Sequence, residues 1–313
     1  MNVGRFIVES AAFTRATLWE RPSRWLIFIL LGLPWMALSS LVESNKILEG
    51  TTLHWNLIPW QETGLLIGAG LLCNFLVSGW VVRLLRDDPD PPDFNNPILL
   101  CLDGMKVHVI PLVWMLVPSV LAFVQYSLVS SGIISGSWWE LNPGTILFLV
   151  LLAIQVIILF IAVQYVMIGA VRFARTGSVR EGFALSGIKK TMDRIGIVNY
   201  YVGLGVIVLV WMLFSIALRG IALLPSAGPV LSLGLSPVPT VFCFRFIAHF
   251  CDEEHLSGGQ GDGEAGTVRA PVSRAVPALV AEFLVWLAIL AVLVVLCFTP
   301  MVLVFGSVSR FIP

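Results

Sequence analysis

Long apolar runs with few or no charged residues constrain this chain more than any other feature of its sequence. A run of about 18 or more such residues is long enough to cross the hydrocarbon core of a bilayer as a helix. Seven runs meet this criterion: Trp25–Val42, Gly64–Val82, Val107–Leu128, Thr145–Val171, Tyr200–Leu218, Pro229–Phe250 and Val276–Phe305. The sequence therefore predicts an all-α, polytopic integral membrane protein with about seven transmembrane helices.

The composition supports this fold class. Hydrophobic residues make up 58% of the chain and charged residues 12%, whereas a soluble domain has about 45–50% and about 25%. The nineteen Lys and Arg balance the nineteen Asp and Glu, so no basic field would attract nucleic acid and none is expected as a partner. The five cysteines are scattered without a C-x-x-C pair, which argues against disulfides and a cysteine-built zinc site.

The distribution of Lys and Arg predicts the orientation. With the N-terminus inside, sixteen of the nineteen basic residues fall on the inner side, and the exceptions are Lys46, Arg219 and Arg310. Basic residues concentrate in cytoplasmic loops, so we expect a plasma-membrane protein with a cytoplasmic N-terminus and an external C-terminus. Small residues at 37–39 are typical of a signal-peptide cleavage site, but 24 residues that include Glu9 and Glu20 precede the first run, which argues against cleavage.

Three amphipathic helices are predicted at the inner interface. The first covers Val3–Glu20, with Val3, Ile7, Ala11 and Leu18 on one face and Arg5 and Glu9 spaced i,i+4 on another. The second follows Asn96 and Pro97, a residue pair that suits an N-cap and the first helical position. The third begins at Ser178 with Glu181 three residues on, as in a capping box. Its apolar stripe is Val179, Phe183, Ile188, Met192 and Ile195.

A spacing of 89 residues suggests an internal repeat. Arg83 and Arg86 close the second run, Arg172 and Arg175 close the fourth (172 − 83 = 175 − 86 = 89), and Arg245 lies near the end of the sixth. We interpret this as a possible threefold repeat of interfacial helix, span and span, although any run that ends inside tends to carry Arg. The predicted organisation is a six-span domain at 1–253, a Gly-rich linker at 254–275 and a seventh span within 276–313.

Candidate functional residues are few. His249, Cys251, Glu253 and His255 have side chains that bind metals, but the motif H-E-x-x-H is absent, so they are candidates only and no metal, cofactor or catalytic residue is predicted. Residues expected to fix topology and meet lipid headgroups are Arg83, Arg86, Arg172, Arg175, Lys189, Lys190 and Arg245. Polar residues within the runs are Asn74, Gln125, Gln155, Gln164 and Glu282. Such amides commonly bond between helices, and a transport path is the alternative.

Motifs at both repeat positions resemble a known family. Gly79-Trp80, Arg83, Arg86, Pro92-Asp93-Phe94, Asp103-Gly104 and Pro118 resemble the first hallmark of the domain-of-unknown-function family 4013. Gly182-Phe183, Ile188-Lys189-Lys190, Ile195-Gly196 and Asn199-Tyr200 resemble its second hallmark. The resemblance covers roughly Val3 to Glu253. It implies a polytopic protein of the plasma membrane of methanogenic archaea and supplies no reaction.

Three functional hypotheses remain open. The first is a non-enzymatic membrane scaffold, envelope-associated factor or subunit of an assembly, with the bilayer, a membrane protein or a second copy as partner. The second is a small-molecule or lipid transporter, suggested by the repeat and by the helix-breaking Pro237 and Pro239. The third is a metal-dependent membrane enzyme that would use the His249–His255 cluster.

Overall fold

The computed structural model describes residues 3–49, 52–86, 90–132, 142–224, 227–251 and 280–292. Its α-helices before residue 252 are α1 (Val3–Leu18), α2 (Pro22–Ser44), α3 (Trp60–Leu84), α4 (Pro97–Ser130), α5 (Pro143–Thr176), α6 (Leu185–Ile195), α7 (Ile197–Ala222), α8 (Gly228–Leu235) and α9 (Pro237–Cys251). Short elements join them: the paired strands β1 (Leu48–Glu49) and β2 (Thr52–Leu53), and the 3-10 turns η1 (Trp55–Leu57) and η2 (Val179–Phe183). An apolar helix at Val280–Val292, called the C-terminal helix below, follows.

Six helical segments of the described chain are long and apolar enough to cross a membrane. They are α2, α3, α4, α5, α7 and the combined α8–α9 segment Gly228–Cys251, so the first six predicted spans are confirmed as helices of the required length. The predicted seventh span reaches beyond the described residues, which include only its Val280–Val292 part. The fold is that of a polytopic, all-α membrane protein apart from the two-residue strands.

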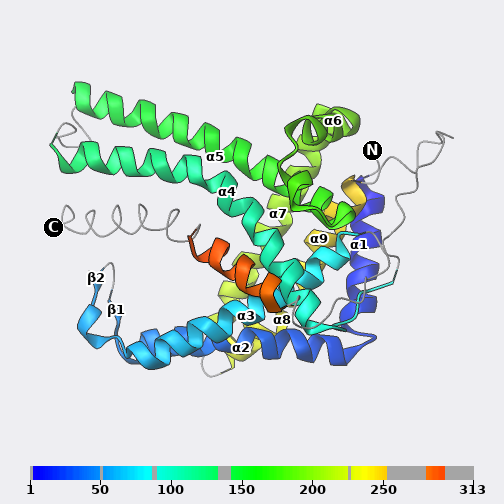
Figure 1. Ribbon diagram of the computed structural model, residues 1–313. Helices are drawn as coiled ribbons and strands as arrows, with labels where there is room; N and C mark the ends of the chain where they lie inside the picture. The colour runs from blue at the N-terminus through cyan, green and yellow to red at the C-terminus, as the bar shows by residue number, and fades with distance from the viewer. Residues whose placement is uncertain are drawn as a thin grey trace.

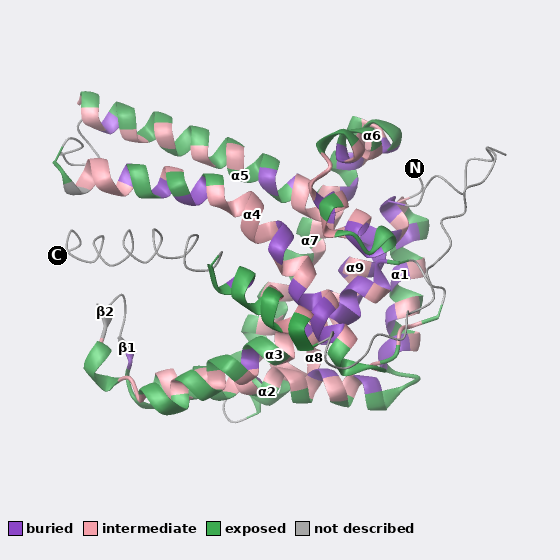
Figure 2. Cartoon of the chain, viewed as in Figure 1, coloured by how far each residue is buried: buried purple, intermediate pink, exposed green. Residues whose placement is uncertain are grey.

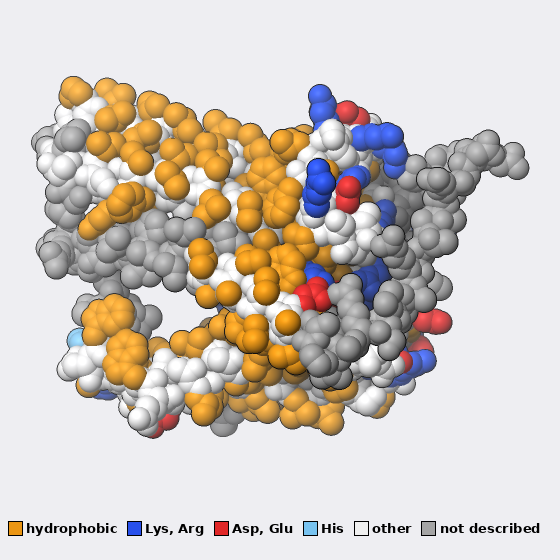
Figure 3. All heavy atoms as spheres, in the orientation of Figure 1, with side chains coloured by type: hydrophobic (Ala, Val, Ile, Leu, Met, Phe, Trp, Pro, Cys, Tyr) orange, Lys and Arg blue, Asp and Glu red, His pale blue; other side chains and the backbone are white. Residues whose placement is uncertain are grey.

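The long helices lie in antiparallel pairs, and their charged residues gather at one end. In Figure 1, α2 pairs with α3 and α4 pairs with α5, while α1 and α6 lie at the right-hand end. Lys, Arg, Asp and Glu side chains cluster at that same end in Figure 3. We call this the charged end; α3, α5 and α9 finish there.

The buried core also lies at the charged end. Trp80, Phe173 and Phe250 are almost completely buried and belong to one apolar cluster that also contains residues of α1, α2 and α4. Away from the charged end the helices are mainly exposed or half-buried in Figure 2, with some buried residues in α4. In α5, only 6% of the most apolar 18 residues are buried. An exposed apolar surface of this extent marks contact with another apolar phase, here the hydrocarbon of the bilayer.

Two glycines bring α3 and α4 into backbone contact. A β-carbon added at Gly79 would overlap the carbonyl oxygen of Leu100, and one added at Gly104 would overlap the carbonyl oxygen of Phe75. Small residues allow such close approach between transmembrane helices. Both glycines belong to the motifs that carry the family resemblance, so those motifs have a packing role.

Two of the predicted interfacial helices differ from the structure. No separate second helix exists after Asn96, because the helix that begins at Pro97 continues as α4 to Ser130 without a break. Asn96 occupies the N-cap position before Pro97 as predicted, but it adopts a left-handed backbone (φ 57°) and its side chain makes no cap bond. Ser178 precedes η2 as its N-cap residue, but its side chain also makes no cap bond. Glu181 pairs with Arg172 instead of closing a capping box.

The third predicted helix is also divided. Residues 179–183 form the 3-10 turn η2, and α6 begins at Leu185. Its apolar stripe nevertheless faces the protein, because Ile188 and Ile195 are buried and Met192 packs against the same core. The sequence pattern thus identified the buried face while misplacing the helix start.

A helix is confirmed at the first predicted position, as α1, but its buried face differs from the predicted one. The buried residues of α1 are Phe6, Ser10, Thr14, Thr17 and Leu18, whereas the predicted face included Ile7, which is 37% exposed. Thr14 donates its hydroxyl to the Ser10 carbonyl at 2.7 Å, and Thr17 donates to the Phe13 carbonyl. Ser and Thr side chains are small, and a hydroxyl that bonds to a carbonyl of its own helix can pack closely against a neighbouring helix. A search for a stripe of hydrophobic residues does not identify such a face.

The sixth span breaks where the sequence places its prolines. Pro237 has no N–H, so the helix stops at α8 and resumes as α9. Ser236 donates its hydroxyl to the Leu233 carbonyl at 2.8 Å. Trp25 of α2 donates its indole N–H to the Gly234 carbonyl at 2.5 Å. Neighbouring groups thus satisfy carbonyls at the break, as membrane-embedded prolines require.

Candidate functional site at the charged end

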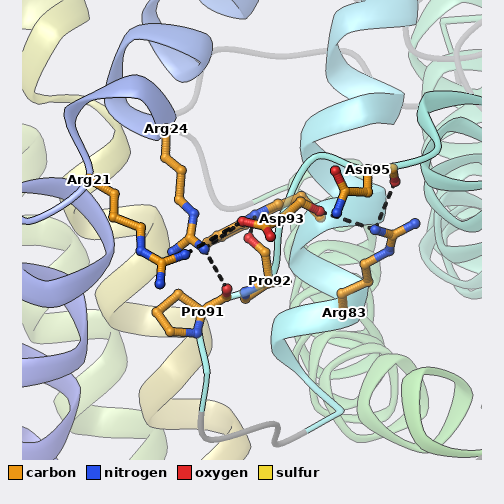
Figure 4. A network of polar contacts seen from close by, with 8 residues as sticks. Arg21, Arg24, Arg83, Pro91, Pro92, Asp93 and Asn95 are labelled. Carbon is orange, nitrogen blue, oxygen red and sulfur yellow. Dashed lines mark hydrogen bonds and ion pairs between the residues drawn. The ribbon is translucent and has the colours of Figure 1, made fainter.

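A tight polar network holds the turn between α3 and α4. Arg24 of α2 is buried, and its Nη2 lies 2.6 Å from Oδ1 of Asp93 and 2.8 Å from the Pro91 carbonyl oxygen (Figure 4). Arg21 approaches the same carboxylate at 3.8 Å. The hydrogen bond from Arg24 holds the pKa of Asp93 below its usual range, because it stabilises the ionised carboxylate.

The α3 side of this turn is fixed by Arg83 and Trp80. Arg83 Nη1 donates to the carbonyl oxygens of Asp93 at 3.1 Å and Asn95 at 2.9 Å (Figure 4). Trp80 donates its indole N–H to the Pro92 carbonyl at 2.8 Å. Phe94 stacks on the Trp80 ring, with the ring centroids 5.9 Å apart. Residues 91–95 of the proline-rich turn are therefore held by side chains of α2 and α3.

Arg86 joins α3 to α5. Its Nε donates to the Ala174 carbonyl at 3.0 Å, near the C-terminus of α5, and its Nη2 pairs with Asp103 of α4 at 3.0 Å. A cation at a helix C-terminus is stabilised by the helix dipole and by carbonyls that have no partner within the helix.

Arg175 repeats this arrangement one helix further on. It donates from α5 to the carbonyls of Ala248 at 3.3 Å and Cys251 at 3.5 Å, at the C-terminus of α9. Arg172 pairs with Glu181 at 2.5 Å and reaches the Gly187 carbonyl at 3.4 Å. Arg83 and Arg172 therefore each bind the segment that follows their own helix, while Arg86 and Arg175 each bind the end of another helix.

Arg245 of α9 contacts α1. It is buried, and its guanidinium carbon lies 4.3 Å from the centroid of the Phe13 ring, a cation–π geometry. Phe6 packs edge-on against Phe246, with centroids 6.3 Å apart, and stacks on His249. The first helix of the chain is thus bound to the last helix before residue 252.

The predicted headgroup residues divide into two groups. The guanidinium groups of Arg83, Arg86, Arg172 and Arg175 bond to protein atoms, and Arg245 is buried against Phe13. Lys189 and Lys190 are exposed on α6. Contact with lipid headgroups therefore stays a prediction whose best-placed residues are these two lysines.

The candidate metal residues lie only partly within the described structure. His249 stacks on Phe6, and the carbonyl of Cys251 accepts a hydrogen bond from Arg175. Glu253 and His255 fall outside the described residues. Within the described ranges, no group of three or more His, Cys, Asp or Glu side chains is placed to hold a metal ion.

An intramembrane histidine is a polar feature that the sequence reasoning missed. His108 of α4 lies 3.0 Å from Asn74 of α3, and its Nδ1 lies 2.6 Å from the Gly104 carbonyl oxygen. Because a carbonyl only accepts, Nδ1 carries the proton in this arrangement and Nε2 accepts from the Asn74 amide. His108 lies within the apolar run Val107–Leu128, and the presence of an ionisable residue in that run was the available signal.

The other intramembrane polar residues are dispersed. Gln125 and Gln164 are buried, and their amide nitrogens have no hydrogen-bond acceptor among the described residues. Gln155 is half-buried. Glu282 lies against Lys106 of α4, with Oε1 and Nζ 2.5 Å apart.

A cavity of about 630 Å³ lies between α5, α7 and α9 and touches α3 at Leu85. Twelve of its thirteen lining residues are apolar, and Ser215 is the exception. Asn74, Gln125, Gln155 and Gln164 do not line it.

Comparison with known proteins places the chain in a family. A family model described as "Protein of unknown function (DUF4013)" matches residues 63–226, which are 164 of the 313 residues. The chain belongs to this family. The DUF4013 match includes α3 to α7 and therefore Arg83, Arg86, Arg172 and Arg175. Searches of curated proteins and of solved structures found no match. The chain is thus a multi-pass integral membrane protein of the DUF4013 family.

Proposed function

We propose that this protein is a non-enzymatic scaffold or subunit of a membrane assembly. The observation that carries the proposal is the use of arginines to join α3, α5 and α9 at the charged end. Arg86 connects α3 to the end of α5, and Arg175 connects α5 to the end of α9. Such cross-links favour one fixed arrangement of the three helices over two arrangements that alternate, as a transporter requires.

We further infer that the three helices belong to a threefold repeat. Arg83, Arg172 and Arg245 each contact an element at the charged end, namely the 90–95 turn, η2 with α6, and α1. The contact of Arg245 with α1 is the third of these contacts. The third copy lacks a counterpart of Arg86 and Arg175, because Ala248 occupies that position three residues after Arg245.

The exposed basic face of α6 is the proposed contact surface. Lys189, Lys190 and Arg194 are exposed there, opposite the buried Ile188 and Ile195. The predicted topology has this face on the cytoplasmic side of the plasma membrane, and the excess of Lys and Arg on that side supports the prediction. Anionic headgroups or an acidic partner would meet the face there.

Copurification from mild detergent tests this proposal. The double variant Lys189→Glu/Lys190→Glu is expected to lose associated protein or anionic lipid while staying folded. A matched control, Lys46→Glu/Arg219→Glu, reverses two exposed cations that the sequence places on the opposite side, and it should retain the association. A strictly monomeric wild-type protein without retained lipid or partner would count against the proposal.

Transport is the second candidate, and the Asn74–His108 pair favours it. Ionisable residues within membrane spans commonly lie on ion or proton pathways, and this one is hydrogen-bonded between α3 and α4. The test is proton flux into proteoliposomes driven by a pH gradient. Flux that disappears in His108→Phe but persists in the exposed-site control Phe123→Leu would establish transport in place of the scaffold role.

A further inference from the structure

The cavity between α5 and α7 has the length of one bilayer leaflet. Its α7 wall runs from Leu204 to Ser215, eleven residues along the helix, or about 16 Å at 1.5 Å per residue. The hydrocarbon core of a bilayer is about 30 Å thick, so one leaflet accounts for about 15 Å. The volume, about 630 Å³, lies within the range of about 300–1,000 Å³ usual for small-ligand pockets.

The cavity opens sideways toward the bilayer. Val163 of α5 and Val208 and Trp211 of α7 line it and are 44%, 57% and 49% exposed. Leu85 and Ile247 close it on the side where α3 and α9 pack. Water gains no hydrogen bonds from an apolar wall, whereas a hydrocarbon chain would recover dispersion contacts that an empty space forfeits.

Polar donors lie at the charged end of the cavity. Tyr200 precedes Leu204 by one helical turn on the same face of α7; it is fully buried, and its hydroxyl has no hydrogen-bond partner in the described part of the chain. Arg86 follows Leu85 directly, and its side chain is 38% exposed. Neither side chain lines the cavity. Arg86 is paired with Asp103 and Tyr200 is buried, so the two residues mark the polar end of the site, where a lipid headgroup would lie.

We propose that this cavity binds one hydrocarbon chain of a membrane phospholipid, with the headgroup at the charged end near Leu204 and the chain end toward Ser215. The proposal is independent of the scaffold role, because it rests on the shape and chemistry of the α5–α7–α9 surface alone.

Photocrosslinking of the full chain tests the site. The protein is reconstituted in vesicles of phosphatidylcholine and phosphatidylglycerol that contain phosphatidylglycerol with a diazirine either near the headgroup or at the end of one chain. Mass spectrometry is expected to find the first probe near Leu204 and the second near Met212 and Ser215. Labels spread evenly over the exposed faces of α2, α5 and α7 would overturn the proposal.

Matched substitutions separate a specific site from general lipid contact. Ala170 lines the cavity, so Ala170→Phe should lower labelling of the 204–215 segment about tenfold, a change equivalent to about 1.4 kcal/mol. Ala153→Phe makes the same change at an exposed position of α5 and should leave labelling unchanged. Where Ala170→Phe prevents folding, Val208→Trp at the exposed rim provides the same test. Unchanged labelling in a folded cavity variant would overturn the proposal.

Discussion

Nζ of Lys106 lies 2.5 Å from Oε1 of Glu282, and this ion pair joins α4 to the C-terminal helix. The same interface contains Leu290, which is buried with Phe75 and Met105 in a second apolar cluster. The C-terminal helix therefore packs against the six-span bundle, although it lies outside the residues that the DUF4013 model matches.

We expect Glu282→Gln to destabilise the protein. The two side chains are only 15% and 23% exposed, so the substitution leaves Lys106 charged and poorly solvated. Breaking a fully buried pair costs about 3–5 kcal/mol, and partial water access should reduce this to about 1–3 kcal/mol. Thermal unfolding in detergent measures the loss, and the added substitution Lys106→Met should recover part of it. The control Glu9→Gln breaks an exposed pair with Arg5 and should cost less than about 1 kcal/mol.

The glycines of the α3–α4 crossing should tolerate no side chain. Gly79→Ala and Gly104→Ala place a methyl group on a carbonyl oxygen of the facing helix, so the helices must separate. We expect each to cost more than about 3 kcal/mol, at the upper end of overpacking effects. Gly68→Ala on α3 is the control, because nothing lies within 4 Å of its added β-carbon; it should be neutral or stabilising by up to about 1 kcal/mol. An equal loss of stability in Gly68→Ala and Gly79→Ala would contradict the close contact of α3 and α4 at Gly79.

Trp25→Phe should destabilise the protein at the break between α8 and α9. The substitution keeps most of the ring and removes the donor to the Gly234 carbonyl, whose loss should cost about 1–3 kcal/mol. Trp35→Phe on the same helix is the control, since Trp35 is 42% exposed. Thermal unfolding in detergent distinguishes the two variants, and an identical loss in both would show that the indole N–H is unimportant.

Asp93 should make stability depend on pH in the acid range. Its pKa is lowered in the folded protein, chiefly by the hydrogen bond from Arg24. The contribution is therefore present above the unfolded pKa, about 3.9, and is lost as pH falls through the folded value. Wild-type protein should lose stability relative to Asp93→Asn as pH falls below about 4. A difference between the two that is constant from neutral to acid pH would contradict this assignment.

Hydropathy predicted the spans well because a helix that faces lipid must be apolar along most of its length. The runs from Trp25 and Gly64, for example, lie inside α2 and α3. The interfacial helices were predicted less well, because capping signals compete with tertiary partners. Glu181 pairs with Arg172 instead of a backbone N–H, and the chain after Pro97 contains no break before the next span.

The sequence predicted which residues form the site, but it did not predict which groups they bond to. Spacing identified Arg83, Arg86, Arg172 and Arg175, yet nothing in the sequence indicated that Arg86 reaches Ala174, 88 residues away. His108 was missed because it was counted as part of an uncharged run. The buried hydroxyl face of α1 was missed because a hydrophobic stripe does not identify small hydroxyl residues. Thr14 donates to the Ser10 carbonyl within the helix, whereas the Ser10 hydroxyl has no hydrogen-bond partner among the described residues.

The packing of α1 against α9 sets an order of events during synthesis. After Leu18 is added to the chain, 219 residues (237 − 18) must be polymerised before the first residue of α9 exists. Since translation adds about 5–20 residues per second, roughly 10 to 45 seconds pass before α1 can pack against α9. Nascent chains therefore carry Phe6 and Phe13 without their final contacts for most of translation. A polypeptide truncated before Pro237 should keep them in that state and be recognised by the membrane quality-control proteases.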